Sequence, residues 1–487
     1  MNPLNLFRPG AYTLLGLVFA QLVVQSCLFA ADPPAPVRPN LVFIVVDDLG
    51  YGDLGCYGGR EIPTPHLDAL AAGGVRFTQG YVTASYCAPS RAALLTGQYQ
   101  TRFGFEGNPT GALNADPRIG LPVTAKTLAD RVRTTGYATG LVGKWHLGGT
   151  PTFHPQRRGF DEFFGFLHEG HTYVAPPWNG VTSWLRRTAL PDGGKGRWTS
   201  PDGRIVWTTH MGNNEPDYNA DNPLLRDSQP VNENAHLTEA FTREACDFIT
   251  RHQAQPFFLY LAYNAVHSPL QADNDYLERF RHIPDIHRRI FAALLAQVDE
   301  GIGAVVARLR ETGLERDTLV VFLSDNGGAT RELTSSNAPL RGEKGSLYEG
   351  GLRVPMLMRW PARFPTGHVV ETPVISVDIT ATALAAARVT PDPAADGIDL
   401  IPFLSTHADP PSDRTFYWRA GARAALRTGP WKLVREPIRG QPGPWQLYHI
   451  DDDIGEKTNL VSRDPARLAE LTERWNRWSA AQASPLW

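Results

Sequence analysis

Short apolar runs alternate with helical patterns along most of the chain, and polar residues follow each apolar run. Continuous apolar runs of this length predict strands that are buried on both faces of a parallel sheet. The alternation predicts an α/β fold with a large, mostly parallel sheet and helices on both faces. The predicted strands are residues 41–46, 75–81, 137–142, 257–262, 319–323 and 354–359, and the predicted helices are residues 66–72, 90–96, 124–134, 237–252, 286–312 and 378–387.

The C-terminal part of the chain has a different pattern. The composition becomes proline-rich and polar near residues 402–411, which predicts a domain boundary. Short predicted strands follow at residues 415–418, 424–428, 431–435 and 446–450, and a predicted helix covers residues 465–480. We therefore expect a large domain over residues 37–408 and a small C-terminal subdomain over residues 409–487, built as an antiparallel sheet with a helix.

The N-terminus is not expected to belong to the fold. An apolar run over residues 11–30 ends in small residues before a proline-rich stretch, which predicts a secretory signal peptide over residues 1–31. A membrane anchor is the alternative, but Gln21 and Gln25 interrupt the run. The stretch before Cys27 faintly resembles a lipoprotein cleavage site. We favour export to the periplasm or the medium over anchoring through Cys27, and we expect no later stretch to span a bilayer.

Composition and charge narrow the function classes. The chain has 487 residues and a formal net charge of -3, so nothing indicates nucleic-acid binding. After removal of the signal peptide, Cys56, Cys87 and Cys246 remain, and an odd number leaves at least one thiol unpaired. Cys246 lies in a helical pattern and is predicted to be a core residue. Cys56 lies in a glycine-rich loop and could be paired or free.

The interval 150–234 has weak periodicity and is rich in glycine and proline. We interpret it as loops that face the substrate, because aromatic side chains can stack on sugar rings. The alternative is that several of its tryptophans only pack the loops down. The residues in question are Trp178, Trp184, Trp198, Trp207, His168, His171 and His210.

Polar residues whose side chains could act in catalysis or bind an ion follow the predicted strands. In open α/β sheets the carboxyl ends of the strands form the ligand-binding edge, so we expect these side chains to converge there. Each residue alone has an ordinary structural explanation, and only the joint pattern indicates a site. The set comprises Asp47, Asp48, Cys87, Arg91, Lys144, His146, His267, Asp325, Asn326 and Lys344.

The residue types in this set indicate a cation and an anionic substrate. Three carboxylates and one amide oxygen suit Ca²⁺ or Mg²⁺ and disfavour zinc. A cation beside Arg91, Lys144 and Lys344 would form a strongly positive pocket, which fits a sulfate or phosphate ester. His146 and His267 would be available for proton transfer near neutral pH.

Cys87 precedes a predicted short helix, with Pro89 suited to its first position. A thiol at a helix N-terminus is a candidate reactive group beside an anion. A buried, inert cysteine under the helix is an equally good interpretation of this stretch alone.

At these residues the sequence resembles the type I sulfatases of the alkaline phosphatase superfamily, and it is similar to arylsulfatases and N-acetylgalactosamine-sulfatases. The most specific match is the Cys-x-Pro-x-Arg motif at residues 87–91, followed by Leu-Thr-Gly at residues 95–97. The other matching segments are residues 47–48, 143–146, 325–327 and 342–346.

The resemblance implies an alkaline phosphatase-like fold and a modified cysteine. A separate maturation enzyme would oxidise Cys87 to Cα-formylglycine, and one hydroxyl of the hydrated aldehyde would attack sulfur. Asp47, Asp48, Asp325 and Asn326 would hold, together with residue 87, one Ca²⁺ per chain, with Mg²⁺ as the alternative ion.

The resemblance also implies roles for the remaining residues. Arg91 would stabilise the hydrated aldehyde, and Lys144 and Lys344 would neutralise the sulfuryl oxygens. His267, with Lys344, would protonate the leaving alcohol, and His146 would remove a proton from the second hydroxyl.

The predicted function is hydrolysis of a sulfuric ester of a sulfated carbohydrate or an aryl sulfate. The enzymatic alternative is a phosphonate or phosphate ester hydrolase that uses the same nucleophile. A catalytically inactive glycan-binding protein is a third interpretation, which a complete set of nucleophile, metal ligands and bases disfavours.

Overall fold

The computed structural model describes residues 38–487. The predicted signal peptide and Cys27 lie outside the described residues.

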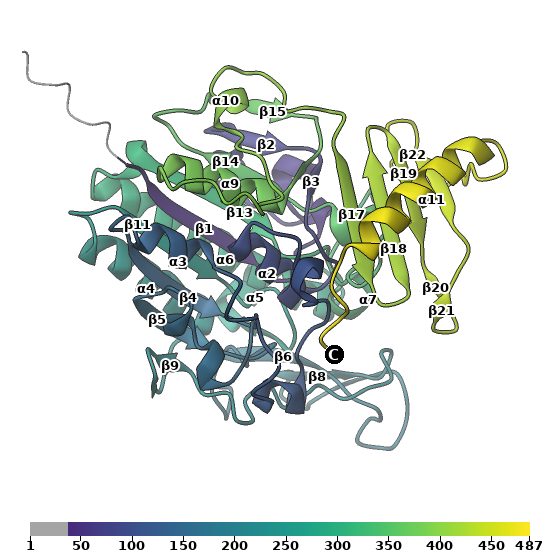
Figure 1. Ribbon diagram of the computed structural model, residues 1–487. Helices are drawn as coiled ribbons and strands as arrows, with labels where there is room; N and C mark the ends of the chain where they lie inside the picture. The colour runs from purple at the N-terminus through teal and green to yellow at the C-terminus, as the bar shows by residue number, and fades with distance from the viewer. Residues whose placement is uncertain (1–37) are drawn as a thin grey trace, which may run out of the picture. The chain divides into compact units, whose positions relative to one another are not determined.

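A ten-stranded mixed sheet forms the centre of the described chain (Figure 1). Its five middle strands are parallel to one another, as predicted. The strands that flank this block on both sides pair antiparallel with it. In sheet order the strands are β10 (Gln229–Pro230), β9 (Leu225–Arg226), β5 (Glu162–Phe166), β4 (Ala138–Lys144), β11 (Phe257–Ala262), β1 (Asn40–Val46), β13 (Thr318–Ser324), β14 (Met356–Arg359), β2 (Val75–Phe77) and β15 (His368–Val370).

Strand β1 shows why the middle strands are apolar at every position. Val42 and Ile44 pack into one hydrophobic core, and Leu41 and Phe43 pack into another on the opposite face. Because both faces are covered, all seven positions of the strand are buried.

Helices cover both faces of the sheet, as predicted. One core includes α1 (Pro65–Ala72), α4 (Leu237–Arg251) and α6 (Ile286–Glu311). The opposite core includes α2 (Cys87–Thr96), α3 (Leu128–Arg133) and α9 (Ser376–Ala386), as Figure 1 shows. The remaining helices are α5 (Asn274–Arg279), α7 (Thr330–Leu333), α8 (Glu349–Leu352), α10 (Ile401–Leu404) and α11 (Pro465–Ala480).

Helix α6 corrects one expectation. Within residues 38–487 it is long and apolar enough, by length and composition alone, to cross a membrane, so the expectation that no such stretch exists is wrong. However, 67% of its apolar window is buried inside the fold, where it packs on α4 and α1. Its apolar surface is therefore explained by core packing.

The interval 150–234 contains more regular structure than predicted. Strands β5, β9 and β10 from this interval extend the main sheet. A second sheet of four strands also comes largely from it, in the order β12 (Leu270–Asp273), β6 (Val181–Arg186), β8 (Ile205–Thr208) and β7 (Arg197–Thr199). These strands have two to six residues, and such short segments have too few positions for a periodic pattern to be visible.

Two other element predictions need correction. The strand predicted over residues 75–81 divides into β2 and β3 (Gly80–Tyr81), and β3 leaves the main sheet to pair with β16 (Val374–Ile375). The helix predicted over residues 124–134 begins later because Thr127 caps it, accepting a hydrogen bond from the Asp130 backbone N–H.

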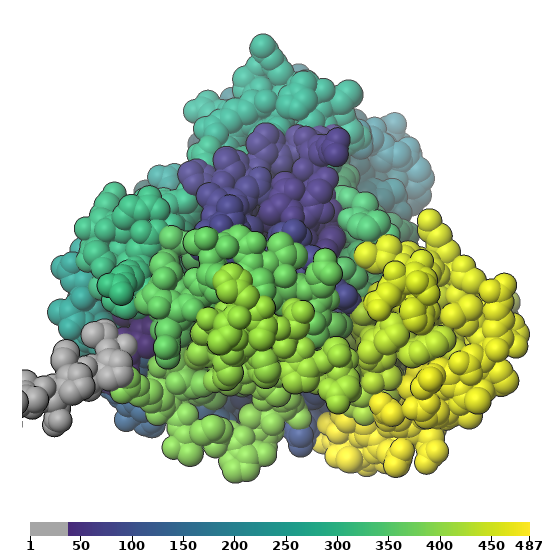
Figure 2. Space-filling model, turned by 90° about the horizontal axis from the view of Figure 1, so that it is seen from above, coloured from purple at the N-terminus to yellow at the C-terminus, as the bar shows by residue number. Residues whose placement is uncertain are grey.

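The C-terminal residues form the predicted small antiparallel sheet with a terminal helix, α11. In Figure 2 this yellow lobe lies against the green segments of the larger body. The boundary between residues 408 and 409 stays a prediction. The strands are β17 (Thr415–Ala420), β18 (Arg423–Thr428), β19 (Trp431–Arg435) and β22 (Gln446–His449), with a small hairpin of β20 (Pro437–Ile438) and β21 (Gln441–Pro442).

A buried charge network joins the C-terminal sheet to the larger body. Lys432 of β19 contacts Glu349 of α8 at 2.9 Å and Glu456 at 3.0 Å. The Glu349 backbone N–H donates to the Glu456 carboxylate at 2.7 Å. Arg427 of β18 also faces Glu349, at 3.4 Å. Lys432, Glu349 and Glu456 are fully buried, so this lysine is shared by two carboxylates in the interior, and Arg427 adds positive charge at Glu349.

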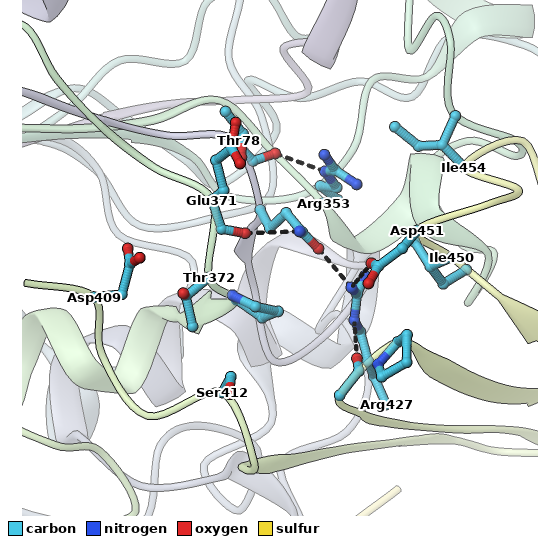
Figure 3. Close-up of a pocket in the computed structure, with 14 residues that line it drawn as sticks. Thr78, Arg353, Glu371, Thr372, Asp409, Ser412, Arg427, Ile450, Asp451 and Ile454 are labelled. Atoms are coloured by element: carbon cyan, nitrogen blue, oxygen red, sulfur yellow. Dashed lines mark hydrogen bonds and ion pairs between the residues drawn. The ribbon is translucent and has the colours of Figure 1, made fainter.

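A cavity of about 850 Å³ lies next to this network. Figure 3 shows Arg353 and Arg427 on its wall, with the Arg427 guanidinium next to Asp451, 3.7 Å away. Thr78 and Arg353 of the larger body and Arg427 and Asp451 of the C-terminal part all line it, so the cavity is bounded by both parts of the fold.

Replacing Lys432 by methionine should destabilise the protein strongly, because Glu349 and Glu456 would remain buried without their shared cation. We expect a loss of about 3–5 kcal/mol in the free energy of unfolding, measured by urea denaturation. Arg477→Met is the control, because Arg477 and Glu473 are both exposed and 3.9 Å apart. Equal stability of the two variants would contradict the importance of the network.

Burial raises the pKa of Glu456 from 4.5 to about 7, although Lys432 opposes the shift. The folded state therefore binds this proton more tightly than the unfolded state does. The contribution of this proton to the free energy of unfolding is fully present below about pH 4.5 and is lost as the pH rises through about 7.

Glu456→Gln should remove this contribution. The difference in unfolding free energy between wild type and variant should change by about 2 kcal/mol between pH 5 and pH 7.5. Urea denaturation at both pH values measures it, with Glu473→Gln as an exposed control. A difference that does not vary with pH would show that Glu456 does not titrate in this window.

Candidate active site

The carboxyl edge of the main sheet positions the acidic residues. Asp47 and Asp48 directly follow β1, and Asp325 directly follows the neighbouring parallel strand β13. The Asp325 backbone N–H donates to Val46 O at 3.1 Å, so the two strand ends stay in register. Asp48 has a positive φ of 63°, which turns the chain sharply after the strand.

Cys87 is the first residue of α2, with Tyr86 as the N-cap. This corrects the expectation that the helix starts after the cysteine, near Pro89. Proline is tolerated anywhere in the first turn of a helix, because N–H groups there have no intrahelical acceptor. The Cys87 Sγ lies 3.3 Å from Asp47 Oδ1 and is fully buried. Burial, together with the Asp47 charge, raises the pKa of this thiol.

Three cations contact the three carboxylates. Lys144 Nζ lies 2.5 Å from Asp47, and Lys344 Nζ lies 2.7 Å from Asp48. Arg91 lies 2.8 Å from Asp325 and 3.5 Å from Asp47. The formal charges of these six side chains therefore sum to zero.

The carboxylates differ in their affinity for protons. Burial, aided by the nearby Asp47 charge, raises the pKa of Asp325 to about 6. Burial would also raise the pKa of Asp47, but Lys144, His267 and Arg91 hold it well below its usual range. Several carboxylates packed this closely would be stabilised by a further positive charge.

The donor set fits a divalent cation. Ligand atoms of Asp47, Asp48, Cys87 and Asp325 all lie within 4.8 Å of one another. Asn326 Nδ2 donates to Asp48 at 2.7 Å, whereas its buried Oδ1 has no hydrogen-bond partner. A buried carbonyl oxygen without a partner is costly, and a metal ion would satisfy it.

In each of the two histidines, one ring nitrogen is next to a backbone carbonyl and the other makes no hydrogen bond within the described residues. His146 Nε2 is 3.0 Å from Pro109 O, and its Nδ1 has no partner. His267 Nδ1 is 2.6 Å from Ser268 O, and its Nε2 lies 3.9 Å from Asp48. Burial lowers the pKa of both rings, aided by Lys144 at His146 and by Lys344 at His267.

Two glycines allow the backbone to approach closely at the site. A Cβ on Gly143, where φ is +110°, would lie 1.9 Å from Ala262 O, and a Cβ on Gly327 would lie 1.8 Å from Gly350 O. Any side chain at these positions would displace the adjoining Lys144 or Asn326.

The structure places all ten sequence-predicted residues in one cluster. Most of the cluster is closed to solvent: the side chains of Asp47, Arg91 and Lys144 have no exposed surface. His267 and Lys344 are the exceptions, with 10% and 15% of their side chains exposed. The cluster therefore opens to solvent beside these two residues.

Sequence reasoning missed a second set of polar residues behind His267. These residues come from the second sheet, from the adjoining loops and from α7, and no motif spacing indicated them. The set is Arg186, Glu215, Tyr218, Ser268 and Glu332.

The tryptophans of the interval 150–234 differ in role. Trp184 is fully buried and stacks on His287 at 3.9 Å, so the packing interpretation is correct for it. Trp198 and Trp207 contact each other at 4.9 Å across β7 and β8 and keep partial exposure.

Comparison with known proteins agrees with this geometry. The family model described as Sulfatase matches residues 39–389, and the model described as N-sulphoglucosamine sulphohydrolase, C-terminal, matches residues 342–478. The chain is 36% identical over 450 residues to steryl-sulfatase of Mus musculus, covering 82% of this chain and 70% of that protein. It is 36% identical over 469 residues to arylsulfatase A of Homo sapiens, covering 90% and 86%.

A solved structure is also similar to this chain over most of its length. The crystal structure of Ps i-CgsB in complex with k-i-k-neocarrahexaose matches with a TM-score of 0.79 and 34% identity, covering 92% of this chain and 94% of that chain. The fold is thus that of the alkaline phosphatase-like sulfatases, with its mixed sheet and small C-terminal sheet. The chain belongs to the sulfatase family and is an enzyme that hydrolyses sulfate esters.

Proposed function

We propose that this sulfatase releases inorganic sulfate from a sulfated carbohydrate, using a nucleophile derived from Cys87 and one divalent cation. The observation that supports this most strongly is the position of Cys87. Its Sγ lies 3.3 Å from Asp47, at the start of α2, in a buried cluster of three carboxylates and three cations. We further propose export of the protein, as the predicted signal peptide implies.

Cys87 would be a precursor. Family membership implies formylglycine at this position, and the Cys-x-Pro-x-Arg motif at residues 87–91 is the segment that a maturation enzyme would read. The hydrated aldehyde supplies an oxygen nucleophile and a second hydroxyl through which sulfate can leave.

Asp47, Asp48, Asp325 and Asn326 would hold the cation, which we propose to be Ca²⁺, with Mg²⁺ as the alternative. When bound, the ion supplies positive charge that activates the nucleophile and neutralises a sulfuryl oxygen. The charges of the three carboxylates and three cationic side chains already cancel. A divalent ion would therefore give the pocket an excess of positive charge, which suits an anionic ester.

The basic side chains would bind and orient the sulfate group. Lys144 and Lys344 each contact one carboxylate and retain further N–H donors for sulfuryl oxygens. Arg91 would stabilise the group at residue 87, and its guanidinium is fixed by Asp325 and by Lys144 O at 3.2 Å. Arg91 and Lys144 are buried, so they act where little water competes for the sulfuryl oxygens, whereas Lys344 lies at the opening.

The histidines would move protons at opposite sides of the ester. His267 Nδ1 is held by Ser268 O, so Nε2 would deliver the proton to the leaving alcohol, together with Lys344. His146 Nε2 is held by Pro109 O, so Nδ1 would accept the proton from the second hydroxyl at residue 87. The exposed edge of His267 faces the opening through which the alcohol would leave.

Similarity supports the carbohydrate assignment. Ps i-CgsB was crystallised with a neocarrahexaose, and this chain covers 94% of it at 34% identity. A panel of monosulfated galactose and N-acetylgalactosamine isomers, with 4-nitrophenyl sulfate as an aryl reference, would identify the sugar and the sulfated position.

Cys87→Ser should keep the fold and the metal site but lose multiple turnover, because serine lacks the second hydroxyl. Sulfate release should stop at about one equivalent per chain, as measured by ion chromatography. Mass spectrometry of the wild-type peptide that contains Cys87 should show formylglycine. Cys246→Ala, in α4, is the control and should retain full turnover. Unmodified cysteine in an active wild-type enzyme would refute the proposed nucleophile.

Asp325→Asn should weaken cation binding, because it removes one carboxylate from the donor set. Ca²⁺ at 100 times its dissociation constant should stabilise wild type by about 2.7 kcal/mol, which calorimetry would detect as a higher Tm. The Asn variant should show a much smaller shift at the same concentration. Asp116→Asn, at a surface pair with Arg118, controls for nonspecific binding. Equal shifts in all three proteins would place the cation elsewhere.

A further inference from the structure

The mouth of the buried pocket has a carboxylate that the proposed reaction does not use. His267 and Lys344 are the two site residues with exposed side-chain edges, and Glu332 of α7 is close enough for its charge to interact with both. Of the Glu332 side chain, 16% is exposed. An alcohol that leaves through this mouth therefore passes Glu332.

Two hydrogen-bonded connections fix Glu332 at this place. On one side, Ser268, the neighbour of His267, donates its hydroxyl to Glu332 Oε1 at 2.7 Å. On the other side, Glu343, the neighbour of Lys344, accepts from the Thr330 hydroxyl at 2.7 Å and from the Arg331 backbone N–H at 2.8 Å. Helix α7 is thus attached to both loops that border the mouth.

The partners of Glu332 use only one of its oxygens. Arg186 Nη1 lies 3.1 Å from the same Oε1 that accepts from Ser268. In residues 38–487, Oε2 accepts no hydrogen bond. Burial would raise the pKa of Glu332, but Arg186, Lys344 and His267 lower it below the usual value, so the group is ionised near neutral pH. A charged acceptor with an open oxygen therefore lies at the mouth.

We propose that Glu332 determines specificity: it accepts a hydrogen bond from a sugar hydroxyl next to the sulfated position and disfavours a second anionic group there. The proposal rests on the proposed function, because the sugar is the leaving group. A hydroxyl donor satisfies the open oxygen, whereas a second sulfate or a carboxylate would be repelled. The substrate class is thus a sugar with one sulfate and a free neighbouring hydroxyl.

Glu332→Gln tests the proposal, because it keeps the shape of the side chain and removes its charge. For the best monosulfated hexose of the panel, kcat/KM should fall about 10- to 100-fold. For 4-nitrophenyl sulfate, which has no neighbouring hydroxyl, it should stay within about twofold. For the same hexose with a second sulfate next to the first, kcat/KM should rise about tenfold.

A deoxy sugar separates substrate recognition from indirect effects on His267. The monosulfated hexose that lacks the neighbouring hydroxyl has a leaving group of similar basicity, so it needs His267 equally. With this substrate Glu332→Gln should cause no further loss relative to wild type. A loss as large as that seen with the parent hexose would show that Glu332 acts by positioning His267 and would overturn the proposal.

Glu215→Gln is the matched control, since Glu215 also pairs with Arg186, at 2.9 Å, but its side chain is only 3% exposed. It should leave the ratios of kcat/KM among the monosulfated hexose, 4-nitrophenyl sulfate and the disulfated hexose unchanged. If Glu332→Gln also leaves these ratios unchanged, the proposal is overturned. If wild type hydrolyses 4-nitrophenyl sulfate but no sulfated sugar, both the subsite and the sugar assignment are wrong. If wild type releases no sulfate at all, the proposed function itself fails.

Discussion

The balance of buried charge at the carboxyl edge of the main sheet is the constraint on which the site depends. Three carboxylates lie in the interior, and such a group is tolerated only when cations contact it directly. The cations come from three separate segments: Arg91 from α2, Lys144 from the end of β4 and Lys344 from the loop before α8. The site is therefore complete only when these segments have packed together.

This balance also explains the preference for an anionic ester. Side chains that neutralise one another leave no net charge for a substrate, so the bound ion decides the sign of the pocket. The unpartnered Asn326 Oδ1 is the clearest sign that the cluster is incomplete without a ligand. The fold supplies rigid strand ends for this purpose, and the neighbouring glycines let the backbones approach closely enough.

The C-terminal sheet and the second sheet contact different parts of the site region. The C-terminal sheet is joined to α8 by the network of Lys432, Glu349 and Glu456, which lies just beyond the loop of Lys344. The second sheet supplies Arg186 to the mouth of the pocket, where α7 brings Glu332. The buried end of the pocket is thus formed by the ends of the parallel strands and by α2, whereas its mouth is formed by the second sheet, by the adjoining loops and by α7.

The sequence by itself predicted the parallel core and the ten residues of the candidate site. Apolar runs identify strands buried on both faces, and polar residues directly after them must meet at one edge, because parallel strands end together. The C-terminal strands and α11 were likewise predicted correctly, since alternation and a clear amphipathic helix are local signals.

Only the tertiary structure decided which groups contact one another and what surrounds them. The start of α2 at Cys87 and the cap of α3 at Thr127 depend on local geometry that the apolar pattern does not report. The second sheet was missed because its strands are short, and Trp184 was placed in a loop although it packs in the core. Arg186, Ser268 and Glu332 are far apart in the chain and match no motif. Their proximity arises from packing between distant segments, which no local sequence pattern encodes.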